Sequence, residues 1–209
     1  MRRFQLFIGI FCTMVLSINA QVKTAQQMDA ASIQRIFLDL DQVAFVNIRA
    51  TQTNKIMMKT VSNGEYSQAI SFDKQIDKKE LRIRSVYDEK LKGGFDKLSA
   101  HKVFSIGLAL TVPADIKVDI STDITNISMN GVFRSVHIEN KFGNCELMDF
   151  EGSANIHTFN GHVHIFTQDA KVEAKTTNGD KNIHRFKREK HLISVRTVDG
   201  NIKIQPQKE

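Results

Sequence analysis

Four polar side chains in the second half of the sequence are of types that can bind a metal or move a proton. They are His162, His164, Glu146 and Asp180. Histidine nitrogens and carboxylate oxygens are frequent ligands of Zn²⁺, and a pair of carboxylates is the usual equipment for hydrolysis of a polysaccharide. Either chemistry requires a fold that brings these groups together, so the elements that carry them decide the matter.

The four residues belong to a repeat in which an apolar–x–apolar triplet returns every nine residues. The triplets are Val118/Ile120, Ile127/Met129, Val136/Ile138, Cys145/Leu147, Ala154/Ile156, Val163/Ile165, Val172/Ala174, Lys181/Ile183, Ile193/Val195 and Ile202/Ile204, with three extra residues before Ile193. Alternation within a triplet is typical of a β-strand, because successive side chains point to opposite faces. Nine residues hold a short strand and a corner, without room for a helix.

Glycine marks every second corner of this repeat. It recurs as Gly143, Gly161, Gly179 and Gly200, and the last three follow Asn or Asp. Such pairs favour tight turns because glycine readily adopts a positive φ. We therefore predict an all-β fold, namely a short β-solenoid of about 18 residues per coil. An antiparallel up-and-down meander is the alternative, since Asn-Gly also favours hairpins.

The rest of the chain is divided by its composition. Residues 1–20 are expected to be a cleaved signal peptide, because Arg2 and Arg3 precede an apolar run and a small residue, Ala20. Residues 21–115 alternate less regularly and are predicted to form an irregular β N-terminal cap or small sheet, with residues 116–209 as the solenoid repeats. Export would leave Cys145 as the sole cysteine, which we expect to be buried and inert.

The register of the repeat assigns a face to every side chain. His162 and His164 are expected on one outer face, with Asn144 and Glu146 on the coil below and Asp180 and Asn182 on the coil above. We interpret them as exposed polar residues and predict no catalytic, cofactor-binding or metal-binding residue. The column of asparagines after the glycine corners is expected to be a hydrogen-bonded ladder. Inside, Ile156 is expected to stack between Ile138 and Ala174, while His157 points outward.

Charge and aromatic content narrow the choice of partner. The formal net charge is +6, and the basic run from Lys187 to Lys190 is interpreted as a solvated loop, so no nucleic-acid partner is expected. No transmembrane segment is expected after signal cleavage. The sequence contains no Trp, and it therefore lacks the aromatic platform that would accompany a polysaccharide-active enzyme.

Several phrases of the sequence are similar to those of a known family. "LTVPADIKVDIST", "NGVFRSVHIENKFGN", "TFNGHVHI", "KTTNGD" and "RTVDGNIKI" resemble the bacterial proteins called putative adhesins, a family of unknown function with a β-helix-like domain that is frequent in Bacteroidetes. The resemblance implies adhesion and provides no catalytic residues.

We therefore expect a non-enzymatic protein without a cofactor, exported to the periplasm or the cell surface. Its expected partner is an extended polymer such as a glycan, or a protein of the cell envelope. Two alternatives are a polysaccharide-active β-helix enzyme and a purely structural or regulatory periplasmic protein.

Overall fold

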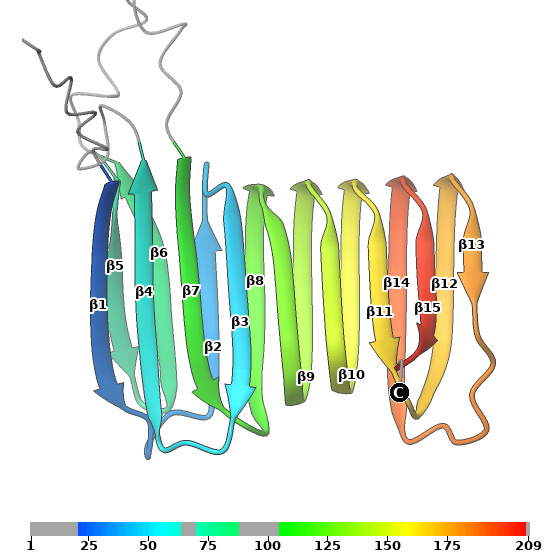
Figure 1. Cartoon of the computed structure of the whole chain (residues 1–209), viewed down its shortest axis with the longest axis horizontal. Coiled ribbons are helices and arrows are strands. Elements are labelled where there is room, and N and C mark those ends of the chain that lie inside the picture. The colour runs from blue at the N-terminus through cyan, green and yellow to red at the C-terminus, as the bar shows by residue number, and fades with distance from the viewer. Residues whose placement is uncertain (1–20, 64–69, 88–104, 208–209) are drawn as a thin grey trace, which may run out of the picture.

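The computed structural model describes residues 21–63, 70–87 and 105–207, and its regular elements there are all strands (Figure 1). The first are β1 (Gln21–Asp29), β2 (Arg35–Leu40), β3 (Phe45–Thr51), β4 (Lys55–Asn63), β5 (Ile70–Asp77), β6 (Glu80–Tyr87) and β7 (Ser105–Pro113). They are followed by β8 (Ile116–Ile124), β9 (Asn126–Phe142), β10 (Cys145–Asn160), β11 (Val163–Thr167), β12 (Ala170–Asn178), β13 (Lys181–Ile183), β14 (His191–Asp199) and β15 (Ile202–Pro206). The predicted all-β class is confirmed, whereas the predicted signal peptide lies outside the described residues.

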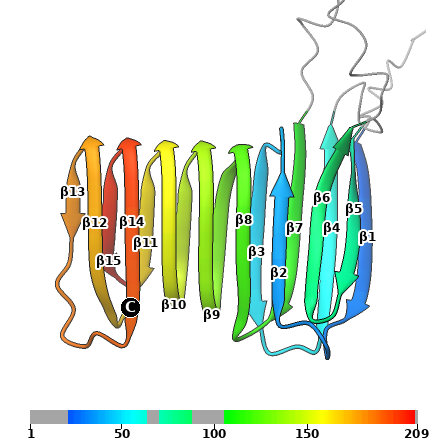
Figure 2. The same ribbon diagram turned by 180° about the vertical axis from the view of Figure 1, so that it is seen from behind.

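The strands form two rows, one behind the other, that run along the long axis of the molecule (Figures 1 and 2). Row A has the order β1-β4-β7-β3-β9-β10-β11-β15-β13, and row B has the order β5-β6-β2-β8-β9-β10-β14-β12. The long strands β9 and β10 pass from row A into row B. The described part of the chain contains no helix long and apolar enough to cross a membrane.

Strands that follow each other along the repeat pair in parallel at a fixed offset. Cys145 of β10 pairs with Ile127 of β9 and with Val163 of β11, positions that lie 145 − 127 = 18 and 163 − 145 = 18 residues away. From β8 to β15 every described pair is parallel. Neighbouring triplets therefore do not form hairpins with each other, and the antiparallel meander is excluded.

The N-terminal strands continue this stacking before they change to antiparallel pairing. β2 pairs in parallel with β8, and β3 pairs in parallel with β9 and β7. Antiparallel pairs occur at the far end, between β1, β4 and β7 and between β5 and β6. Strands on both sides of residue 115 share one buried core, so packing is continuous across the predicted boundary between residues 21–115 and 116–209.

The last two levels of the stack are not in sequence order. β14 lies between β10 and β12, and β15 lies between β11 and β13. Ile156 is fully buried, as predicted, but its neighbour in this column is Val195, and Ala174 lies one level beyond Val195. The expected contact between Ile156 and Ala174 is therefore wrong, because the segment after the three extra residues enters between them.

Glycine at the corners is explained mainly by the close approach of stacked backbones. A Cβ atom on Gly143 would lie 2.2 Å from the carbonyl oxygen of Thr125, and one on Gly161 would lie 2.0 Å from that of Gly143. Gly143 also has a φ of 118°, as a tight turn requires, whereas Gly161 is not among the positive-φ glycines. The prediction that Gly161 is needed for a positive φ is thus wrong. This corner needs glycine because a side chain would collide with the backbone of the neighbouring coil.

Candidate functional site

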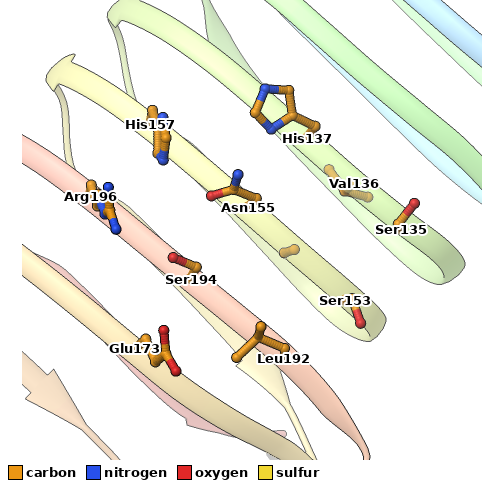
Figure 3. Close-up of a pocket in the computed structure, with 11 residues that line it drawn as sticks. Ser135, Val136, His137, Ser153, Asn155, His157, Glu173, Leu192, Ser194 and Arg196 are labelled. Atoms are coloured by element: carbon orange, nitrogen blue, oxygen red, sulfur yellow. The ribbon is translucent and has the colours of Figure 1, made fainter.

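A hollow lined by an ordered array of polar side chains lies on the outer surface of row B (Figure 3). This groove is shallow, with a volume of about 510 Å³. It is lined by Ser135, Val136, His137, Ser153, Ala154, Asn155, His157, Glu173, Leu192, Ser194 and Arg196. We call it the row B groove.

The groove crosses four adjacent strands, β9, β10, β14 and β12, and the alternation of each strand points its side chains outward. The register aligns His137, Asn155, Ser194 and Glu173 in one column across these strands. Because adjacent strands lie about 4.8 Å apart, the column repeats polar groups at that spacing. A second column contains Ser135, Ser153 and Leu192, and a third contains His157 and Arg196.

The groove offers neutral hydrogen-bond donors and acceptors, together with one positive side chain, Arg196, and one negative side chain, Glu173. His137 and His157 meet edge to face with ring centroids 6.1 Å apart, and His137 Nε2 lies 3.3 Å from Glu139 Oε1. Among the lining residues the only carboxylate is Glu173, which also lies near Lys171. In the described part of the chain, no hydrogen bond joins a groove serine to a groove histidine. The arrangement can bind polar groups in rows, but lacks the nucleophile–base contact of covalent catalysis.

The four residues singled out from the sequence lie on the outer surface of row A, where Glu146 is next to His164 as predicted but Asp180 is separated from the other three. His164 is flanked by Glu146 on one side and Lys203 on the other, because β15 enters between β11 and β13. In the neighbouring column, Asn201 and not Asp180 follows His162. Glu146 and Asp180 are therefore three strand levels apart, about 14 Å at the usual strand spacing. The expectation that Asp180 and Asn182 lie directly above the two histidines is wrong.

The surroundings of both histidines are unfavourable for a cation. Burial and the nearby Lys203 ammonium lower the pKa of His164, while Glu146 opposes the shift. His162 uses Nδ1 to accept a hydrogen bond of 3.0 Å from the backbone N–H of Asn201. Within the described residues, no group of three or more His, Cys, Asp or Glu side chains could hold a metal ion.

The predicted asparagine ladder is confirmed, and His162 is part of it. The side-chain oxygen of Asn126 accepts the backbone N–H of Asn144, whose own oxygen accepts that of His162. Asn201 continues the ladder by accepting the N–H of Asp180. The side chains of this column therefore link successive corners of the stack by hydrogen bonds.

The cysteine thiol and the phenylalanine side chains are two further groups that could react or bind a partner, and their burial decides whether they can. Cys145 is buried, as predicted, and burial raises the pKa of its thiol to about 12. Phe133 and Phe150 are buried and stacked in the core, with centroids 6.0 Å apart. Phenylalanines recur near the corners of the repeat, which predicts that they pack there. Phe142 and Phe159 instead form an exposed edge-to-face pair at the glycine corners, so this prediction is wrong for these two.

The nine-residue register of the sequence assigns His137, Asn155, Glu173 and Ser194 to one outer column of the groove, and the structure places all four there. Their order differs from the sequence order, because the insertion of β14 puts Ser194 between Asn155 and Glu173. The only signal of this insertion in the sequence was the three-residue lengthening before Ile193.

Comparisons with known proteins identify the fold. No protein-family model matches the chain, and no curated protein matches it. A crystal structure of a putative cell adhesion protein from Clostridium sporogenes superposes with a TM-score of 0.66 at 14% identity, covering 90% of this chain and 100% of that chain. A putative adhesin from Bacteroides fragilis matches at 10% identity and a TM-score of 0.37, covering 88% and 97%. The likeness to the Clostridium protein shows a shared fold, and the name of that protein agrees with the putative adhesins that the sequence phrases resemble.

Proposed function

We propose that the chain is an exported, non-enzymatic binding protein whose row B groove holds an extended polymer. In this proposal the stacked strands form a short β-solenoid of about 18 residues per coil, built on the irregular N-terminal strands. The observation that carries the proposal is the column of His137, Asn155, Ser194 and Glu173, which repeats polar groups across four strands.

The chemistry of the groove favours a glycan as the polymer. Hydroxyl and amide side chains, Ser135, Ser153, Asn155 and Ser194, supply donors and acceptors without a net charge, as sugar hydroxyls require. The imidazole rings of His137 and His157, which meet edge to face, add flat aromatic rings and further hydrogen-bonding nitrogens beside them. A regular spacing of about 4.8 Å along the groove suits a ligand that itself repeats.

A binding role accounts for the groove better than hydrolysis does. Glycoside hydrolysis requires two carboxyl groups on either side of the scissile bond, at most about 9.5 Å apart. Glu173 on β12 and Glu139, which contacts His137 on β9, are three strand spacings apart, about 14 Å. The name of the Clostridium neighbour, a putative cell adhesion protein, supports a binding role at the cell envelope or outside the cell. A periplasmic and a surface location both fit this proposal.

The test is binding of the exported chain to an array of glycans and matrix proteins, with a parallel assay for polysaccharide cleavage. Asn155→Ala/Ser194→Ala should reduce glycan binding at least tenfold, since two adjacent groups of the column are lost. Lys203→Ala, on the outer surface of row A, is the matched control and should bind normally. Equal loss in both variants, binding to proteins alone, or release of cleaved glycan would each contradict the proposal.

A further inference from the structure

The C-terminal strands enter the stack in a way that bears on assembly of the protein. We define the inserted segment as residues 191–206, which contain β14 and β15. The slot is the space between β10 and β11 on one side and β12 and β13 on the other. In Figures 1 and 2 the inserted segment, in red, lies between yellow and orange strands that come earlier in the sequence. The last segment of the repeat is therefore not the last level of the stack.

The inserted segment is a complete interior level of the core. Ile193, Val195, Ile202 and Ile204 are all fully buried. The level outside it is less well covered: Val172 and Ala174 are only partly buried, and Ile183 is 37% exposed. The slot is therefore a binding site for two strands, with hydrogen-bonding edges on both sides and apolar walls.

Residues 184–190 connect the inserted segment to β13, and we call them the tether. The tether returns past the connection between β11 and β12, and both line one hollow at the lower end of the stack in Figure 1 (Gln168, Asp169, Phe186 and Lys187). Connections rarely cross at one edge of a sheet. Except for Phe186, every tether residue is exposed, and the tether is held by the buried Phe186 ring, by the ion pair of Lys190 with Glu151, and by the bond from the His184 N–H to the carbonyl of Ile204.

The walls of the slot do not distinguish the segment of the same chain from that of another copy. Val195 pairs with Ile156 on one side and Ala174 on the other, and the corner residue Asn201 is likewise hydrogen-bonded to both walls, to His162 and to Asp180. Identical chains offer identical walls and identical segments, which is the condition for exchange between protomers. A tether of seven residues, at roughly 3.3–3.6 Å per residue, spans up to about 25 Å when it is extended.

We propose that residues 191–206 of one copy fill the slot of a second copy, so that the protein assembles by exchange of the inserted segment. The contacts of the segment are the same in both arrangements, but in the exchanged form the tether need not turn back across the β11–β12 connection. The partner is thus a second copy of this chain, and the site is the slot. The inference is independent of what the row B groove binds.

Single cysteine substitutions on the two sides of the slot test the exchange. Asn155 and Ser194 are adjacent across β10 and β14 and both point outward into the groove. Asn155→Cys and Ser194→Cys chains, each also carrying Cys12→Ser, are unfolded together, refolded at high concentration and oxidised. Cys145 stays buried. Exchange places position 155 of one chain against position 194 of the other, so a disulfide-linked dimer should form and increase with protein concentration.

The control pair is Asn155→Cys mixed with His137→Cys, whose positions are adjacent across β9 and β10 and lie outside the inserted segment. This mixture should give at least fivefold less linked dimer. The double variant Asn155→Cys/Ser194→Cys shows that the segment occupies a slot, because its thiols must pair in either arrangement. Linked dimer no more abundant than in the control, together with complete pairing within single chains of the double variant, would overturn the proposal.

Discussion

At the residue scale, His162 shows how a side chain of catalytic type is used for structure. Its Nδ1 accepts the N–H of Asn201, at a position where the neighbouring levels carry asparagine. We expect His162→Asn to leave the free energy of unfolding nearly unchanged, because an asparagine oxygen accepts the same bond. His162→Ala should cost about 0.5–1 kcal/mol, the usual value of one hydrogen bond. Urea unfolding of both variants decides, and equal losses would contradict the ladder role.

A second residue-scale prediction concerns a pair of carboxyl groups beside the row B corners. A side-chain hydrogen bond with Asp123, followed by burial and the Asp123 charge, raises the pKa of Asp41 to about 6. Although burial opposes it, hydrogen bonds from Asp41 and from the N–H of Gln42 lower the pKa of Asp123. For Asp41, the folded chain binds a proton that the unfolded chain releases near 3.8, so this contribution to stability is lost as the pH rises to about 6.

Asp41→Asn should therefore raise the Tm at pH 7.5 and have little effect at pH 4.5. The amide keeps a donor for Asp123 and removes the repulsion between two carboxylates. Since the pair is mostly exposed, screening limits the gain to about 1–2 °C. Thermal unfolding at the two pH values measures it, with Asp77→Asn on β5 as the control. A larger gain at pH 4.5 than at pH 7.5 would refute the assigned direction.

At the scale of elements, the sequence predicted the register of the strands but not the order of the last two levels. Each triplet fixes which side chains point inward, and Ile156 and Ile138 stack as their spacing requires. The triplets of β12 and β14 are equivalent in this respect, so either could pair with β10. Pairing energy depends on the apolar pattern, which both share, and nothing in the period distinguishes a neighbour in sequence from a neighbour in space.

Aspartate substitutions distinguish the two orders. Val195 is fully buried between Ile156 and Ala174, whereas Ala174 is partly exposed on the outermost level. Val195→Asp should cost several kcal/mol, because it buries an unpaired carboxylate, and Ala174→Asp should cost about 1 kcal/mol or less. Denaturant unfolding compares them. If the strands stacked in sequence order, Ala174→Asp would be the more damaging change.

At the scale of the whole molecule, the insertion predicts how the stack opens. Stability within a protein is uneven, and levels with few buried contacts open first. The outermost level is β12 and β13, where Val172 and Ala174 are partly buried and Ile183 is 37% exposed, while the inserted β14 and β15 are held by strands on both sides. Amide hydrogen exchange should therefore be faster in β12 and β13 than in β14 and β15, although the latter come later in the chain. The middle of β9 and β10 serves as the slow reference. Faster exchange in β14 and β15 than in β12 and β13 would mean that the final strands lie at the end of the stack, and the slot would then not exist.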